Sequence, residues 1–155
     1  MEAFRQAAFY AIIVALVYGV LKLVQYLDIV HVPENYGDIN GLEPYSSYRI
    51  DGGVPFTQLR SGDAICYRLG PETERAVQFG WIAAVPGDEI AVSDGTLQVN
   101  GTPSPHSGKL PIPDCPALRI PAQHLYVLSD GHQADSVARG LIPAIAVRGR
   151  LARLP

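Results

Sequence analysis

The chain has 155 residues, a formal net charge of −3, 48% hydrophobic residues and only 17% charged residues. This length is sufficient for one domain with its own hydrophobic core. The basic residues form no cluster, so nucleic acid is not an expected partner. The apolar excess is concentrated at the N-terminus, and the rest is rich in glycine, proline and β-branched residues, which predicts a mainly β domain.

The first predicted element is an apolar segment. Residues 7–21 carry no charged side chain, and apolar residues continue beyond Lys22. A membrane-spanning helix needs about 20 apolar residues, and a lysine near its end can reach the lipid headgroups. No small-residue cleavage pattern follows and no polar face appears, so an anchor is favoured over a cleaved signal peptide or a buried helix. We therefore expect residues 1–30 to be a transmembrane anchor, contacting the bilayer through residues 7–27, and residues 31–155 to be a separate β-domain.

The charges around this segment predict its orientation. Arg5 precedes the apolar run, whereas Asp28, Glu34 and Asp38 follow it. Because positively charged flanks tend to stay in the cytoplasm, the N-terminus is expected there and the domain outside.

The remaining chain is interpreted as short strands separated by turns. Pro86-Gly87 and Asp94-Gly95 are turn pairs that divide residues 79–101 into a three-stranded meander. Six prolines between residues 102 and 121 argue against a strand there and predict an extended surface excursion. Residues 129–140 are interpreted as a polar loop. The expected strands cover residues 47–50, 64–69, 82–85, 89–92, 96–99, 125–128 and 144–150.

Five sequence boxes follow the apolar segment in a specific order. The boxes are Gly62-Asp63-Ala64-Ile65, Val85-Pro86-Gly87-Asp88-Glu89-Ile90 with Val99-Asn100-Gly101, Asp135-Ser136, Gly140-Leu141-Ile142-Pro143 and Val147-Arg148-Gly149-Arg150. Together they resemble the boxes of bacterial signal peptidase I (leader peptidase) and its relatives, including conjugative-transfer maturation peptidases. The resemblance covers most of the chain after residue 38. It implies a membrane-anchored, mainly β fold and a Ser/Lys dyad that acts outside the cytoplasmic membrane.

The chain departs from this family at the residues that carry the chemistry. The nucleophile box, Ser-Met-x-Pro, corresponds to residues 41–44, so Gly41 stands at the serine position. Counting back from Asp88 places Gly80 at the position of the general-base lysine and Trp81 at the following arginine. Val137 replaces the arginine of the Asp-Ser-Arg box.

These departures remove the dyad. A serine hydroxyl needs a positioned base, and a lysine serves as that base only when its pKa is lowered by burial. The chain has two lysines, Lys22 in the predicted anchor and Lys109 in the proline-rich excursion. We therefore predict no catalytic residues.

The resemblance then implies a non-catalytic relative in the bacterial cytoplasmic (inner) membrane, crossing it once. The family binds an extended substrate by strand addition, so a relative that has lost the dyad is expected to bind or scaffold a membrane protein or an extended peptide. An assembly factor or a subunit of a membrane complex would fit this role. By analogy alone, the expected groove residues are Leu42, Glu43, Pro44, Trp81, Ile82 and Ala83.

Alternatives remain open at this stage. Ser46 or Ser47 is the candidate nucleophile of an active peptidase with a rearranged site, and a purely structural subunit with a filled groove is a third hypothesis. Ser129, Asp130 and His132 lie together in one loop, where turn formation is the simpler interpretation. Trp81 would either fill the groove or anchor a partner.

No metal or other cofactor is expected. The four histidines, at positions 31, 106, 124 and 132, lack metal-site spacing. Cys66 and Cys115 are the only cysteines, and the sequence leaves open whether they form a disulfide or whether Cys66 is a buried strand residue.

Overall fold

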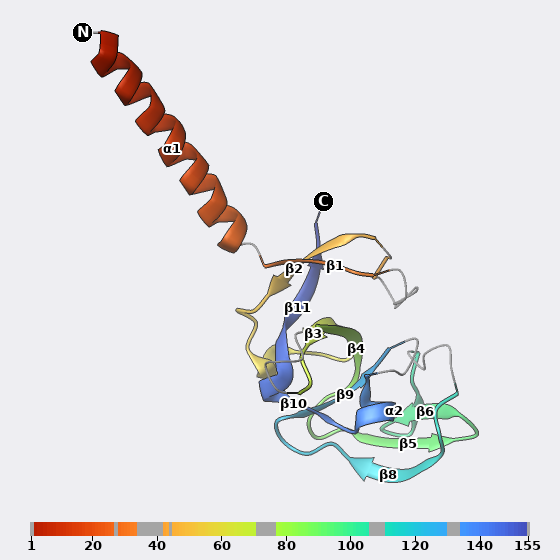
Figure 1. Cartoon of the computed structure of the whole chain (residues 1–155). Coiled ribbons are helices and arrows are strands. Elements are labelled where there is room, and N and C mark those ends of the chain that lie inside the picture. Colours follow the sequence, from red (N-terminus) through yellow and green to blue (C-terminus); the bar gives the residue numbers. More distant parts are fainter. Residues whose placement is uncertain are drawn as a thin grey trace.

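The computed structural model describes residues 2–26, 28–33, 42–43, 45–70, 77–105, 111–129 and 134–154 (Figure 1). The helices are α1 (Glu2–Tyr26) and α2 (Ser136–Arg139), with 3-10 turns η2 (Phe56–Gln58) and η3 (Ala144–Ala146). The strands are β1 (Ile29–His31), β2 (Ser47–Asp51), β3 (Ala64–Tyr67), β4 (Gln78–Ala84), β5 (Glu89–Ser93), β6 (Thr96–Val99), β7 (Thr102–Pro103), β8 (Cys115–Arg119), β9 (His124–Leu128), β10 (Ile142–Pro143) and β11 (Val147–Arg153). The predicted mainly β class is confirmed.

The strands form two antiparallel sheets. The larger has seven strands in the order β1-β2-β11-β3-β4-β9-β10, and the smaller has four in the order β7-β6-β5-β8. β4 therefore lies in the interior of the large sheet, paired with β3 on one side and β9 on the other. The chain passes from one sheet to the other at the Pro86-Gly87 turn between β4 and β5.

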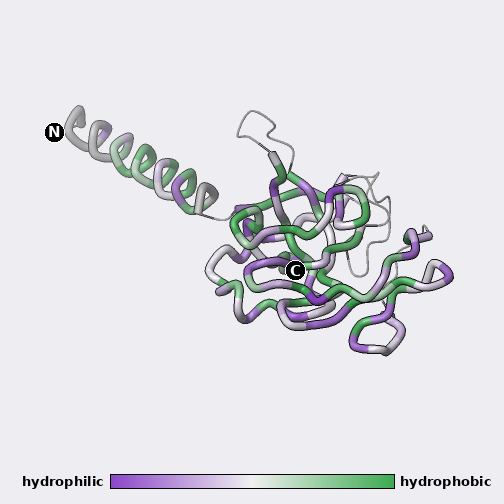
Figure 2. The backbone as a smooth tube through the Cα atoms, turned by 90° about the horizontal axis from the view of Figure 1, so that it is seen from below, coloured by the Kyte–Doolittle hydropathy of each residue, from purple (hydrophilic) through white to green (hydrophobic). Residues whose placement is uncertain are grey.

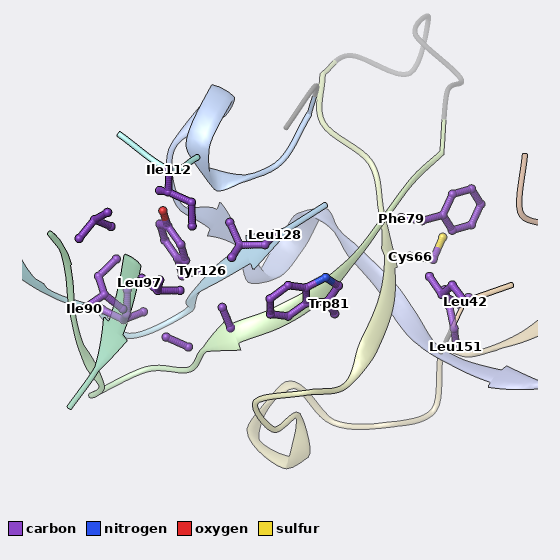
Figure 3. Close-up of a cluster of buried hydrophobic side chains, with 14 of the residues drawn as sticks. Leu42, Cys66, Phe79, Trp81, Ile90, Leu97, Ile112, Tyr126, Leu128 and Leu151 are labelled. Atoms are coloured by element: carbon purple, nitrogen blue, oxygen red, sulfur yellow. The ribbon is translucent and has the colours of Figure 1, made fainter. Parts of the chain in front are cut away.

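Both faces of β4 are buried, which explains its nearly continuous apolar sequence. Trp81 and Ala83 belong to one core cluster, together with Leu128 of β9 and residues of the small sheet (Figure 3). Ile82 points to the other face and packs in a second cluster with Ile65. The two clusters form one core layer on each side of the large sheet.

The proline-rich excursion differs from its prediction. It contains β8, which pairs with β5 although Pro116 lies within it. β8 is an edge strand, so its outward-facing groups need no ladder partner, and the register shifts between Ile90 and Val92, beside the proline. A proline is compatible with a strand at such an edge or irregularity.

Other predicted segments need correction at their boundaries. β3 ends at Tyr67 rather than at residue 69, and β4 begins at Gln78 rather than at residue 82. The last strand begins at Val147, because residues Ala144–Ala146 form a 3-10 turn. The loop expected at residues 129–140 contains α2, whose first turn is capped by the Asp135 carboxylate. A helix this short depends on its cap and its packing, which periodicity does not reveal.

The N-terminal helix α1 extends away from the β-domain and is coloured as largely hydrophobic (Figures 1 and 2). Among the residues that the structure describes, no helix combines the length and the apolarity required to cross a membrane. The predicted transmembrane helix is thus not supported by the structure. The helix ends at Tyr26, and Ile29 already pairs with Arg49 of β2.

The two cysteines are free thiols. Cys66 is fully buried on β3, whereas Cys115 begins β8 in the other sheet. Burial raises the pKa of the Cys66 thiol from 9.0 to about 12. Cys66 is therefore a buried strand residue, which is the alternative to a disulfide with Cys115.

Candidate functional site

The position expected for the general base lies on β4, where Gly80 is paired with Ile65 of β3. A Cβ atom built on Gly80 would lie 2.7 Å from Val127 Cγ1 and 2.8 Å from the Leu128 carbonyl oxygen. The Leu128 oxygen belongs to the backbone of β9 and cannot rotate away as a side chain can. Position 80 is therefore occupied by its neighbours, and a lysine there would force the two strands apart.

Trp81 follows directly and lies in the core. Its side chain has no exposed surface, and Figure 3 shows it among other buried residues, between Leu128 and Cys66. Its neighbours Ile82 and Ala83 are also fully buried. In this conformation these three side chains offer no surface to a partner, and Trp81 fills space.

The segment that corresponds to the nucleophile box lies beside the same core. Gly41 and Pro44 lie outside the described residues. Leu42 is 2% exposed and packs in the cluster that contains Trp81. The structure thus brings three predicted groove residues, Leu42, Trp81 and Ala83, together as core, while Ile82 packs on the opposite face.

Glu43 is the exposed member among the described groove residues. Its carboxylate accepts two hydrogen bonds from the Arg153 guanidinium, at 2.7 and 2.8 Å. Its backbone N–H donates to the Tyr48 hydroxyl at 2.8 Å. These contacts attach the segment to the ends of β2 and β11, and they leave Tyr45, two residues further on, 70% exposed.

One alternative nucleophile has a possible base beside it. Ser47 Oγ lies 2.9 Å from His31 Nδ1, and the two residues face each other in the β1–β2 register. Among the described residues, no carboxylate hydrogen-bonds to His31. The pair is not apparent from the sequence, because His31 and Ser47 are 16 positions apart and only their strand pairing brings them together.

The loop that contains Ser129 has a structural role. Asp135 is fully buried, and its Oδ2 accepts a hydrogen bond from the Ser129 backbone N–H at 2.9 Å. Its Oδ1 accepts from the N–H groups of Val137 and Ala138, the first turn of α2. Ser136 Oγ accepts from the Val127 N–H. Asp130 and His132 lie outside the described residues.

The two segments of the second box, with Pro86-Gly87-Asp88 and with Asn100, form one hydrogen-bonded unit. Asn100 Nδ2 donates to Asp88 Oδ1 at 2.8 Å, and Asn100 Oδ1 accepts from the Glu89 N–H at 2.9 Å. Asp88 Oδ2 accepts from the Val85 N–H and closes the turn. These two segments, which are separated by the β5–β6 hairpin, are therefore joined by hydrogen bonds into one unit.

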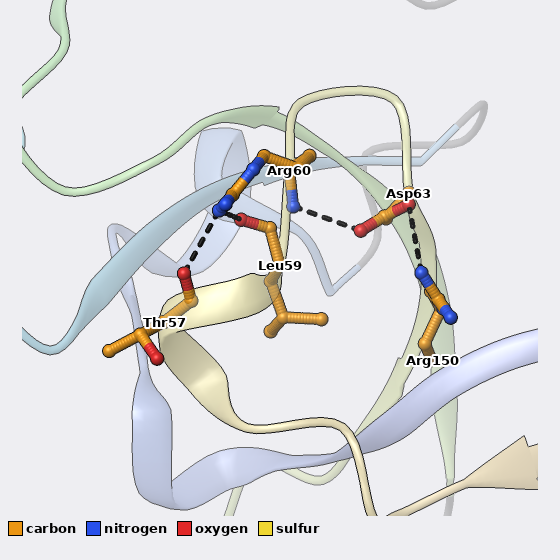
Figure 4. Close-up of polar contacts among 5 residues, drawn as sticks. All are labelled: Thr57, Leu59, Arg60, Asp63 and Arg150. Atoms are coloured by element: carbon orange, nitrogen blue, oxygen red, sulfur yellow. Dashed lines mark hydrogen bonds and ion pairs between the residues drawn. The ribbon is translucent and has the colours of Figure 1, made fainter.

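The first and last boxes also meet (Figure 4). Asp63 Oδ2 accepts from the Arg60 backbone N–H at 2.9 Å, and its other oxygen lies 4.0 Å from Arg150 Nη1. Gly149 is required by a close approach, because a Cβ there would lie 2.7 Å from the Asp51 carbonyl oxygen. The boxes that carry the family resemblance thus serve as turns, caps and close contacts.

Within the part of the chain that the structure describes, no group of three His, Cys, Asp or Glu side chains could hold a metal ion.

The described residues form a mainly β domain with a curled seven-stranded sheet and two closed core layers. The Ser47–His31 pair is a possible nucleophile and base on its surface.

No family model matches the chain, and no curated protein matches it. One similar solved structure is a signal peptidase I from Enterococcus faecalis, with 19% identity and a TM-score of 0.47. The match covers 61% of this chain and 97% of that one.

Proposed function

We propose that this chain is a non-catalytic, signal-peptidase-like protein that binds or scaffolds a partner protein or an extended peptide in a membrane complex. The observation that carries the proposal is the contact of Gly80 with the β9 backbone, which leaves no space for a general-base side chain. Lys22 belongs to α1, so Lys109 is the one lysine of the sequence that follows this helix. A Ser/Lys dyad in the expected arrangement has no lysine at its required position.

The structural roles of the sequence boxes support the same proposal. The Asp88–Asn100 unit and the Asp135 cap stabilise the domain whether or not a dyad is present. Selection for a folded scaffold would keep such boxes after the loss of catalysis. Position 80, in contrast, has no structural requirement for a lysine.

The proposed partner surface is centred on the segment that leads into β2. Tyr45 is a large, exposed side chain, and tyrosine is enriched among residues that dominate binding energy. The bidentate ion pair of Glu43 with Arg153 holds the adjoining backbone. A held segment loses less conformational entropy when it binds.

The proposed location is the bacterial inner membrane, with the N-terminus in the cytoplasm and the domain outside. The exposed apolar side chains of α1, including Phe9, Leu16 and Leu21, favour contact of residues 7–27 with lipid. Vesicle flotation of the full chain tests this contact. Val17→Lys is expected to reduce flotation, whereas the control Thr96→Lys on β6 is not, and equal flotation of both variants would contradict the proposal.

A cleavage assay tests the loss of catalysis. The purified full chain in mild detergent is incubated with a signal-peptide substrate beside an active signal peptidase as the positive control. We expect no cleavage by this chain. Cleavage that persists after purification and is abolished by one serine substitution would overturn the proposal.

Photo-crosslinking in the native membrane tests the partner surface. A benzoyl-phenylalanine at position 45 preserves an aromatic side chain, and the same group at position 118, on exposed β8, is the matched control. We expect a discrete adduct at position 45 alone, which mass spectrometry then identifies. Adducts of equal yield at both positions, or at neither, would contradict a specific partner at this segment.

An active peptidase with a rearranged nucleophile is the second candidate, and the Ser47–His31 contact favours it. A neutral imidazole 2.9 Å from a hydroxyl can accept its proton during attack. In the cleavage assay, this candidate predicts activity that both Ser47→Ala and His31→Gln abolish. Ser46→Ala is the control, because Ser47, and not Ser46, is paired with His31.

A further inference from the structure

A cavity of about 310 Å³ lies outside the predicted groove. Its walls come from three connections: the η2 segment, the β4–β5 turn and the β8–β9 turn. The lining is mostly apolar, with Phe56, Leu59, Val85 and Pro86, and it includes the polar residues Arg60 and Gln123. The volume is at the lower end for a ligand pocket, which suits one amino-acid residue rather than a large ligand.

Arg60 supplies a fixed positive charge at this cavity. Its Nη1 donates to the carbonyl oxygens of Thr57 at 2.9 Å and Leu59 at 3.0 Å (Figure 4). The nearby Asp63 carboxylate is occupied by the Arg60 backbone N–H and by Arg150. Among the described residues, no carboxylate forms an ion pair with the Arg60 guanidinium. Its remaining N–H donors are therefore oriented but not neutralised.

Gln123 stands on the opposite connection in an unusual backbone conformation. Its φ is +63°, a left-handed value that non-glycine residues seldom adopt. Its carbonyl oxygen accepts from the Ala144 N–H at 2.7 Å, which holds the turn in place. Backbone strain of this kind is concentrated at functional sites. Gln123 lines the cavity, and a glutamine amide can both donate and accept a hydrogen bond.

We propose that this cavity binds the C-terminal residue of a peptide with an apolar side chain. The side chain would pack against Phe56 and Leu59, and the terminal carboxylate would pair with the Arg60 guanidinium, whose planar donors match a carboxylate. The Gln123 amide is suited to hydrogen-bond the last peptide group of that ligand. A C-terminal residue carries a carboxylate, an apolar group and a peptide group within a short distance. The proposal does not depend on the proposed function, because the cavity shares no residue with the predicted groove.

Calorimetry with the full chain in detergent micelles tests the proposal. The probes are acetyl-Ala-Ala-Leu with a free carboxylate, the same peptide as its C-terminal amide, and octanoate. We expect the free acid to bind at least about tenfold more tightly than the amide, since a hydrogen-bonded charge pair is lost. Equal binding of acid and amide, no binding of the acid at millimolar concentration, or binding of octanoate alone would each overturn the proposal.

Single substitutions test whether the peptide binds at the cavity beside Arg60. Arg60→Gln is expected to weaken binding of the free-acid peptide by about tenfold and to leave binding of the amide peptide unchanged. Arg49→Gln, at an exposed position of β2, is the matched control and should bind the peptide as the unaltered chain does. If Arg60→Gln fails to fold, the comparison of acid and amide on the unaltered chain decides the question. Unchanged binding of the acid by a folded Arg60→Gln variant would overturn the assignment.

Discussion

Gly80 and Leu128 lie so close together that a Cβ on the glycine would be 2.8 Å from the leucine carbonyl oxygen. We expect Gly80→Ala to destabilise the domain by about 1–3 kcal/mol, because an added methyl group in a packed core strains the backbone. Urea unfolding followed by circular dichroism measures this change. Gly53→Ala is the control, since the nearest contact of a Cβ there is an ordinary 3.6 Å. Equal stability of the two variants would contradict the close contact.

The same contact predicts that the expected dyad cannot be rebuilt by two substitutions. Gly41→Ser with Gly80→Lys should yield a destabilised protein without peptidase activity, because the lysine stem must displace the β9 backbone. The measurement combines thermal unfolding with cleavage of a signal-peptide substrate. A stable, active double variant would show that position 80 has space after all.

The buried Asp135 carboxylate is expected to be a major contributor to stability. Asp135→Ala removes the acceptor for Ser129, Val137 and Ala138 and leaves their N–H groups unsatisfied, which costs about 2–4 kcal/mol. Chemical denaturation measures the loss. Asp114→Ala, which removes one exposed 3.3 Å contact with Gly95, should change stability by less than about 1 kcal/mol.

The link between Asp88 and Asn100 predicts a charge-specific effect. Asn100→Asp replaces the donor to Asp88 by a second carboxylate, so we expect a destabilisation of about 1–3 kcal/mol. Asn100→Gly tolerates the left-handed φ of 52° and removes the side chain without adding charge. The aspartate variant should be the less stable of the two in thermal unfolding. The reverse order would show that the acceptor for the Glu89 N–H, which an aspartate keeps and a glycine loses, outweighs the repulsion from Asp88.

Stability is expected to fall at alkaline pH. Burial raises the pKa of Cys66 from 9.0 to about 12, and burial with the nearby Asp135 raises that of Tyr126 from 10.0 to about 12. Between these values the unfolded chain loses protons that the folded chain keeps, so the free energy of unfolding decreases as pH rises. Melting temperatures from pH 8 to 11 measure the decrease. Cys66→Ala should make this decrease shallower, and a slope identical to that of the unaltered chain would exclude Cys66 as a cause.

Local chemistry in the sequence determined the meander and the strand-rich class. Pro86-Gly87 and Asp94-Gly95 mark turns by their own conformational preferences, and the φ values of Asp94 and Gly95, 51° and 71°, match the expected tight hairpin. The apolar run at residues 82–85 likewise predicts a strand, and the structure adds that both faces of this strand are buried. Such features depend on residues adjacent in the chain, which is why they can be read without a structure.

Tertiary structure decided the features that depend on strand pairing between distant residues. Pro116 is accepted in β8 only because that strand lies at an edge of the small sheet. The contact of Gly80 with β9, the pair of Ser47 with His31 and the cavity at Arg60 all join segments far apart in the chain. The sequence alone shows that glycine replaces the expected lysine. The structure adds the physical reason why a lysine has no space there: the backbone of β9 already occupies the position.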